Sequence, residues 1–238
     1  SIINWVLESL KLQENDALFI IYHNSLQKAN FEDVISRDFP GVTFRRLANN
    51  TRGAAETVLK CIDSIPSERR GLKTVCLDGD TFYEIDVIDI ARSIPGGVVC
   101  FEDRQEKPIY SYVSLNDSGG ILDIAEKSRI SDFANTGCYV FESTEALEKY
   151  CKITISNGIK EKGEFYISAV LKAMLEDGLS LSHRVIGEGD FVVLGTPYQV
   201  KLFSSERASR AEKKRFCFDI DNTILSYPEI IGDYSTCK

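Results

Sequence analysis

The sequence has no apolar run that approaches the roughly 20 residues that a membrane-spanning helix requires. It also lacks a positively charged and then apolar segment at its start, which is the pattern of a secretory signal. We therefore expect a cytoplasmic protein that does not bind membranes.

An excess of positive charge is missing as well. The chain contains 28 Lys and Arg against 36 Asp and Glu, which gives a formal net charge of -8 at pH 7. A surface that follows nucleic-acid phosphates needs a net basic face, so this charge argues against sequence-independent nucleic-acid binding. The expected partner is a small molecule.

The cysteines show no pattern of paired ligands. They are odd in number and include no CxxC pair, and most have apolar neighbours. These features predict reduced core residues rather than a disulfide or zinc framework. The seven positions are Cys61, Cys76, Cys100, Cys138, Cys151, Cys217 and Cys237.

Helical patterns alternate with short apolar strands over the first hundred residues. This alternation predicts an α/β fold in which a mostly parallel sheet forms the middle of three layers. From residue 110 onward, a hairpin around residues 116–120 and several further helices and strands form an α+β layer that would cover a substrate. The expected strands are 17–22, 42–47, 74–77, 98–102 and 135–141, and the expected helices include 26–39, 85–94, 144–150 and 164–176.

Two aspartates follow the buried strand 74–77. Asp78, Gly79 and Asp80 lie at its carboxyl end, where open α/β sheets bind ligands. A carboxylate there is well placed to hold a divalent cation that bridges phosphate oxygens, so Asp80 is a candidate metal ligand and Asp78 its helper. A solvated Asp-Gly turn has the same three residues and is the alternative.

A polar turn leads through Arg52 and Gly53 into a helix that begins with alanines. Small residues such as Gly53 and Ala54 at a helix start let a flat ring or a phosphate approach the free N–H groups. The alternative is that these small residues only pack against the sheet.

A basic stretch, residues 204–215, is typical of a linker or a solvated helix. The run FDIDNT follows it. Asp219 and Asp221 are presented on one side of an extended backbone, so one can attack phosphorus while the other moves a proton, and the Thr223 hydroxyl can hold a phosphoryl oxygen.

Seven segments, taken in order over residues 1 to about 203, resemble the nucleotidylyltransferases that make nucleoside-diphosphate sugars and related activated alcohols. They are SIINWVLESLKL, ANNTRGAAETVL, LDGDTFY, AEK, NTGCYVF, GEFYISAVL and LGTPYQVKLF. The FDIDNT run is similar to the first motif of haloacid-dehalogenase phosphatases, and some capsule and surface-glycan proteins join these two modules.

The resemblance implies the nucleotide-diphospho-sugar transferase fold, Mg²⁺ as cofactor and a set of site residues. Gly53, Ala54 and Gly79 would contact the nucleotide, and Asp80 and Lys127 would act in catalysis. The acceptor site would comprise Glu126, Lys127, Gly137 and Glu164. In the phosphatase module, Asp219 and Asp221 would be catalytic and metal-binding, and Thr223 would bind phosphate.

The chain departs from the family pattern at two places. The glycine-rich loop that wraps the triphosphate would lie before Ser1, so we expect residues 1–203 to be an N-terminally incomplete transferase domain and 216–238 the start of a phosphatase domain. A second metal-binding aspartate is common two residues before the glycine of the GTP motif, where this chain has Val193.

The predicted activity is nucleotidyl transfer from a nucleoside triphosphate to a sugar phosphate or small alcohol phosphate, for surface polysaccharide precursors. One alternative is a metal-dependent glycosyltransferase, because Asp78 and Asp80 also resemble that class's DxD motif. The other is a non-catalytic nucleotide-binding or regulatory domain, which Val193 favours. Each of these three functions is compatible with assembly into a homo-oligomer.

Overall fold

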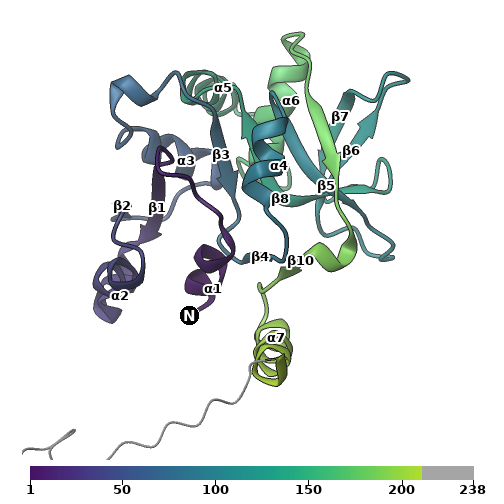
Figure 1. Ribbon diagram of the computed structural model, residues 1–238. Helices are drawn as coiled ribbons and strands as arrows, with labels where there is room; N and C mark the ends of the chain where they lie inside the picture. The colour runs from purple at the N-terminus through teal and green to yellow at the C-terminus, as the bar shows by residue number, and fades with distance from the viewer. Residues whose placement is uncertain (211–238) are drawn as a thin grey trace, which may run out of the picture. The chain divides into compact units, whose positions relative to one another are not determined.

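A computed structural model describes residues 1–210 of the chain. Residues 1–200 form the first of two units, and helix α7 (Pro197–Arg210) runs past the start of the second at Lys201. The first unit contains all the other elements (Figure 1). Asp219, Asp221 and Thr223 lie outside the described residues. Within residues 1–210, no helix has the length and apolar character that crossing a bilayer requires.

A six-stranded sheet forms the middle of the first unit. Its strands follow the order β7-β6-β8-β5-β9, and β3 pairs with the other end of β8. Strand β8 is nine residues long and therefore has room for all three neighbours. The bounds are β3 (Thr74–Leu77), β5 (Gly97–Glu102), β6 (Ser111–Leu115), β7 (Ile121–Glu126), β8 (Phe133–Phe141) and β9 (Ser182–Val185).

The predicted α/β fold class is confirmed, although the sheet is mixed in direction. Strand β8 runs antiparallel to β3, β5 and β6, whereas β5 and β9 are parallel. The hairpin β6–β7 and the return of the chain through β8 create these antiparallel pairs, which a pattern of alternating helices and strands does not reveal.

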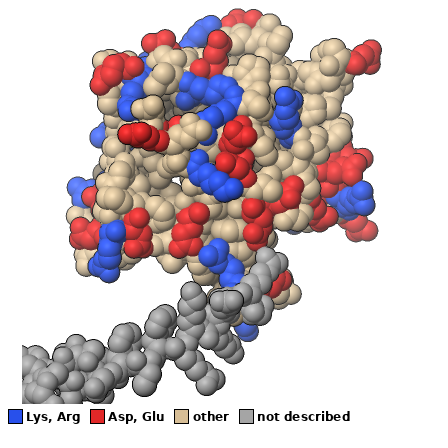
Figure 2. Space-filling view, viewed as in Figure 1, with Lys and Arg blue, Asp and Glu red and all other residues tan. Residues whose placement is uncertain are grey.

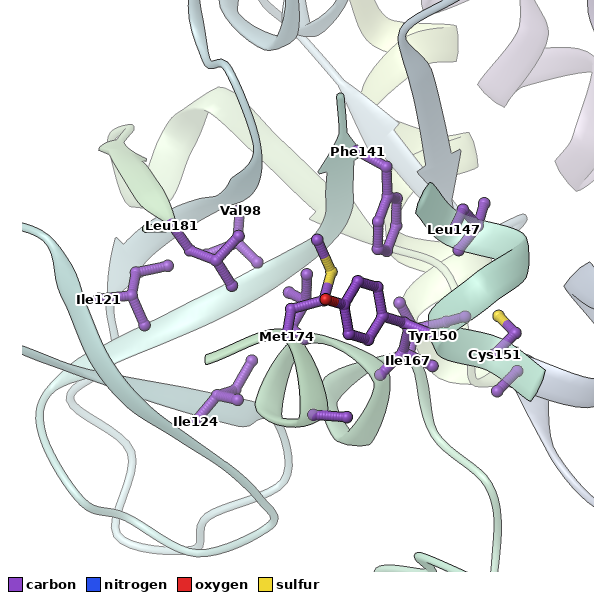
Figure 3. Close-up of a cluster of buried hydrophobic side chains, with 14 of the residues drawn as sticks. Val98, Ile121, Ile124, Phe141, Leu147, Tyr150, Cys151, Ile167, Met174 and Leu181 are labelled. Carbon is purple, nitrogen blue, oxygen red and sulfur yellow. The ribbon is translucent and has the colours of Figure 1, made fainter. Parts of the chain in front are cut away.

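Apolar side chains cover both faces of the sheet, which gives the three expected layers. Val98 and Cys100 of β5 face α3 (Ala54–Ile62), α5 (Thr144–Ser156) and α6 (Ile167–Glu176). Their neighbours Val99 and Phe101 face α4 (Val87–Ser93). Figure 3 shows the first of these clusters, where Met174 and Tyr150 meet residues of the sheet.

The N-terminal segment contains a second, two-stranded sheet and short helices. Helix α1 (Ile2–Ser9) precedes β1 (Leu18–His23), which pairs in parallel with β2 (Val42–Leu47). The expected helix over 26–39 is instead the 3-10 helix η1 (Asn24–Ala29) followed by α2 (Phe31–Asp38). Asn30, with φ 49°, separates them because a left-handed residue cannot continue either helix. Strand β1 is mostly half-buried, and of its residues only Tyr22 is buried.

The remaining elements are short. Strands β4 (Thr81–Tyr83) and β10 (Phe191–Val193) form an antiparallel pair, and the 3-10 helices η2 (Ser67–Arg69) and η3 (Glu188–Asp190) are single turns. The five described cysteines are free thiols, of which Cys100, Cys138 and Cys151 are buried, as expected of core residues. The other two cysteines lie outside the described residues.

A buried carboxylate joins the segments that follow β5 and β7. Asp103 is only 1% exposed and accepts hydrogen bonds from the Tyr112 hydroxyl (2.5 Å) and the Arg129 guanidinium (3.0 Å). Arg129 also donates to the Asp103 carbonyl oxygen at 2.9 Å and to the carbonyl oxygen of Gln105. These bonds fix the backbone around residues 127–132.

We expect Asp103→Ala to lower the free energy of unfolding by about 3 kcal/mol, because it leaves a buried hydroxyl and a half-buried guanidinium without their acceptor. Asp132 is the matched control. It pairs with the same Arg129 at 3.4 Å, but its side chain is 73% exposed. Asp132→Ala should change the free energy of unfolding by less than about 0.5 kcal/mol. Equal effects in urea titrations of the two variants would contradict this account.

Candidate functional site

The turn after β3 is fixed at both ends by backbone hydrogen bonds. The Asp78 N–H donates to the Gly137 carbonyl oxygen of β8 at 2.9 Å. On the other side, the Leu194 N–H donates to the Asp80 carbonyl oxygen at 2.7 Å, next to the pairing of Val193 with Thr81. The turn therefore joins β8 and the segment after β10, which carry two of the predicted motifs.

Two glycines lie against the two aspartate side chains. A Cβ on Gly137, whose φ is 91°, would lie 2.5 Å from Oδ2 of Asp78. A Cβ on Gly195 would lie 2.9 Å from Oδ2 of Asp80. Any side chain at either position would displace a carboxylate, so the glycines make room for this pair.

Gly137 lies within β8 rather than at its entrance. The register between β5 and β8 shifts at Val99 and Cys100, and Thr136 and Gly137 lie in the resulting bulge. Strand β8 therefore continues through Thr136 and Gly137, and it begins two residues before the predicted start at Asn135. A bulge re-aims the backbone locally, and here it presents Gly137 to Asp78.

The Asp78 carboxyl group is protonated more readily than an ordinary aspartate. Desolvation by the surrounding segments, then the charge of Asp80 and then that of Glu126, raise its pKa to about 7. Asp78 nevertheless has an exposed surface. Glu126, at the end of β7, is near enough for its charge to contribute to this shift.

The two carboxylates fit a Mg²⁺ ion that also contacts a substrate. Mg²⁺ is commonly bound through one or two carboxylates together with substrate phosphates, whereas an all-protein site needs more ligands. Within residues 1–210, no group of three or more His, Cys, Asp or Glu residues could hold a metal ion by itself. Val193 adds no carboxylate beside Asp80, so Asp78 and Asp80 are the residues that would hold the ion.

Glu126 is a buried acid at the end of β7. It is 7% exposed, and its Oε2 accepts a hydrogen bond from the Ser168 hydroxyl of α6 at 2.8 Å. Desolvation raises its pKa, and the bond from Ser168 opposes this shift. Its N–H donates to Oε2 of Glu161 at 2.7 Å. Glu126 therefore connects β7 to α6 and to the segment that precedes α6.

Lys127 is exposed and follows Glu126 with a left-handed backbone, φ 50°. Its N–H donates to the Tyr110 carbonyl oxygen at 2.8 Å, and its ammonium donates to the Tyr166 hydroxyl, also at 2.8 Å. Non-glycine residues with positive φ are uncommon and cluster at functional sites. The geometry is consistent with the predicted role of Lys127 in binding an anion.

The turn before α3 is joined to the segment before α6. The Phe165 N–H donates to the Arg52 carbonyl oxygen (3.0 Å), and the Phe165 carbonyl oxygen accepts from the Ala55 N–H (2.9 Å). Gly53, with φ 141°, makes this approach possible, because a Cβ there would lie 2.5 Å from the Phe165 backbone. Ala54 is exposed at the start of α3. The predicted nucleotide turn and the predicted acceptor helix are therefore physically connected.

The structure places most of the predicted site residues in two connected groups. Asp78, Gly79, Asp80 and Gly137 form the first, and Gly53, Ala54, Glu126 and Lys127 are joined through Phe165, Tyr166 and Ser168 in the second. Glu164 is exposed, and its backbone pairs with Glu161.

Sequence reasoning missed Glu161, Tyr166 and Ser168. Glu161 and Glu126 are 35 residues apart, and Tyr166 and Lys127 are 39 residues apart. Periodicity and spacing carry no signal for contacts of this kind, because the contacts depend on how β7 packs against α6.

Charge on the surface is mixed. On the face drawn in Figure 2, Lys and Arg side chains are interspersed with Asp and Glu side chains. That face of the described part carries no extended basic patch.

A family model described as nucleotidyl transferase matches residues 1–188. No curated protein matches the sequence. Among solved structures, a nucleoside-diphosphate-sugar pyrophosphorylase from Vibrio cholerae RC9 is similar, with TM-score 0.68 and 22% identity, over 79% of this chain and 80% of that chain. The inositol-1-phosphate CTP transferase from T. maritima has TM-score 0.66 and 12% identity, over 91% of this chain and 85% of that chain.

A third similar structure is HddC from Yersinia pseudotuberculosis complexed with GMP-PN. Its TM-score is 0.54 and its identity 15%, over 87% of this chain and 83% of that chain. These three similarities establish the fold of the chain.

The raised pKa of Asp78 predicts a pH dependence of stability. Between pH 4 and about 7 the folded protein keeps a proton that the unfolded chain loses, so ionisation of Asp78 increasingly opposes folding as the pH rises. The full shift would correspond to about 4 kcal/mol, but solvent reaches the carboxylate, and we expect about 1–2 kcal/mol. Asp78→Asn should therefore gain that much stability relative to the unsubstituted protein between pH 5 and pH 8, measured by urea unfolding without divalent cations.

Asp177→Asn is the control for this experiment. Hydrogen bonds from Tyr150 and then Lys149 hold the pKa of Asp177 below its ordinary value, so Asp177 is ionised throughout this pH range. Its stability difference from the unsubstituted protein should stay constant from pH 5 to pH 8. A pH-independent difference for Asp78→Asn as well would show that Asp78 titrates normally.

Proposed function

The chain belongs to the nucleotidyl transferase family, and we propose that it transfers the nucleotidyl group of a nucleoside triphosphate to the phosphate of a sugar phosphate or small alcohol phosphate. The observation that carries this proposal is the pair Asp78 and Asp80 in the turn after β3, each with a glycine against its carboxylate. Among the described residues, neither carboxylate has an ion-pair partner, so both are available to a cation that accompanies a phosphate.

The names of the similar structures support this choice of acceptor. One is a nucleoside-diphosphate-sugar pyrophosphorylase and another uses inositol 1-phosphate, so a sugar phosphate and an alcohol phosphate are both represented. The third structure holds a nucleotide analogue. A role in making surface polysaccharide precursors in the cytoplasm is part of the same proposal.

The reaction needs positioning more than covalent help. An oxygen of the acceptor phosphate attacks the α-phosphorus, the bond from that phosphorus to the bridging oxygen breaks, and pyrophosphate leaves with the bond electrons. The attacking oxygen is already anionic, so no proton has to be removed. Catalysis then depends on in-line geometry and on stabilising the developing negative charge.

Each group of residues has a part in this reaction. A Mg²⁺ ion held by Asp78 and Asp80 would supply positive charge to the triphosphate. Lys127 binds the acceptor phosphate with a charge-assisted hydrogen bond and fixes the direction of attack. Exposed Ala54 and the backbone of Gly53 lie against the base, and Glu126 and Gly137 line the acceptor side together with Glu164.

A glycosyltransferase would use the same two carboxylates for a nucleotide-sugar donor. The family match and the contact of Gly195, in the GTP motif, with Asp80 favour nucleotidyl transfer. The phosphatase activity predicted for Asp219, Asp221 and Thr223 stays a prediction, since these residues lie outside the described part.

We expect the longest natural form of the chain to release pyrophosphate from one nucleoside triphosphate when Mg²⁺ and a matching sugar or alcohol phosphate are present. Asp80→Asn should lower kcat/KM by about 100-fold or more, because it removes charge-stabilising interactions made in the transition state. Lys127→Ala should instead raise KM for the acceptor about 10-fold and leave KM for the triphosphate unchanged.

Asp117→Asn, in the exposed β6–β7 turn, serves as the control and should leave these constants unchanged. Nucleotide binding without pyrophosphate release across the whole panel would overturn the proposal in favour of a regulatory domain. Transfer of a sugar from a nucleotide sugar would indicate the glycosyltransferase instead.

A further inference from the structure

We propose that Tyr166 is a positioning residue that holds the Lys127 ammonium in place for the acceptor phosphate. This inference rests on the proposed function. It adds a specific role for a side chain that sequence reasoning does not single out, and it explains how an exposed lysine can select one direction of attack.

The ammonium of Lys127 contacts Tyr166 in two ways. Its Nζ donates to the hydroxyl at 2.8 Å and lies 4.9 Å from the centre of the ring. A free lysine side chain samples many rotamers, and ordering it costs about 2 kcal/mol of conformational entropy. A lysine already held by Tyr166 binds a phosphate without that cost.

The Lys127 backbone is held independently of Tyr166. Its N–H bonds to Tyr110, the preceding Glu126 is held by Glu161 and Ser168, and Arg129 is held by Asp103. The ammonium end is therefore the part of Lys127 that Tyr166 has to order.

Tyr166 is itself attached to the nucleotide turn. It directly precedes α6, and the adjacent Phe165 makes both of its backbone hydrogen bonds to the turn around Gly53. The backbone at Tyr166 is thus held close to the start of α3. Phe165 and Tyr166 are consecutive residues. A nucleotide bound at the turn around Gly53 and an acceptor phosphate bound by Lys127 would therefore be held close to each other.

Tyr166 does not neutralise Lys127, so the lysine charge stays available to an anion. Within residues 1–210, no carboxylate lies at ion-pair distance from the Lys127 ammonium. The hydrogen bond that the ammonium donates to the Tyr166 hydroxyl and, at longer range, the charges of Glu126 and Glu164 keep the pKa of Lys127 above its ordinary value. A neutral hydroxyl accepts one of the three N–H bonds and neutralises nothing, so two donors and the full charge remain for an anion.

Lys149 and Tyr150 on α5 form a second lysine–tyrosine contact, in which the lysine also has a carboxylate partner. The Lys149 ammonium donates to the Tyr150 hydroxyl at 3.1 Å and lies 4.5 Å from its ring. Here Asp177 also accepts from the same ammonium at 3.1 Å, so the charge is compensated. This second pair provides a matched control.

The test is Tyr166→Phe, which keeps the ring and removes the hydroxyl. We expect KM for the acceptor phosphate to rise about fivefold to tenfold, with KM for the triphosphate unchanged. In a Lys127→Ala background, Tyr166→Phe should have no further effect, because a positioning residue acts only through its partner. Tyr150→Phe should leave both KM values unchanged.

A second readout does not depend on activity. The rate at which an acetylating reagent labels Lys127, followed by mass spectrometry, should rise at least about threefold in Tyr166→Phe, because the hydroxyl stabilises the ammonium over the reactive amine. Glucose 1-phosphate and inositol 1-phosphate should protect Lys127 in the unsubstituted protein and protect it less in the variant.

The inference is overturned if Tyr166→Phe leaves acceptor KM and Lys127 labelling unchanged, or if its effect is the same without Lys127. A protein that releases no pyrophosphate would contradict the proposed function by itself. In that case the labelling and protection measurements still decide the role of Tyr166.

Discussion

The candidate site depends on the close approach of two backbones, at Asp78 and Gly137. The Asp78 N–H bonds to the Gly137 carbonyl oxygen, and the missing side chain of Gly137 leaves the space that the Asp78 carboxylate occupies. Because β8 also pairs with β5 and β6, this contact fixes the end of β3 relative to the rest of the central sheet. A bulge in β8, rather than a loop, makes the contact possible.

The charges of the candidate site determine which ligands it favours. Desolvation and the charges of Asp80 and Glu126 raise the cost of ionising Asp78, and a cation beside the two carboxylates would lower that cost. Lys127 is the opposite case, a cation that donates a hydrogen bond to a phenol and has no carboxylate at ion-pair distance among the described residues. An anionic acceptor and a cation-bound nucleotide are the ligands that satisfy both groups at once.

The sequence alone predicted most elements and the sheet-edge aspartates, because buried strands and helix boundaries leave local signals. It did not predict the antiparallel direction of β8, the interruption at Asn30 or the bulge at Gly137, since each depends on pairing with distant strands or on a single backbone angle. In the candidate site, motif order singled out Asp80 and Lys127 as the residues to test. The partners Glu161, Tyr166 and Ser168 follow only from the packing of α6 on β7.

The central claim is that Asp78 and Asp80 hold the divalent cation that accompanies the nucleotide. Anomalous diffraction from crystals grown with Mn²⁺ and a non-hydrolysable nucleoside triphosphate tests it most directly. The account predicts that the Mn²⁺ ion in contact with the triphosphate is also coordinated by a carboxylate oxygen of Asp78 or Asp80. A nucleotide whose Mn²⁺ ion contacts neither residue would contradict the account.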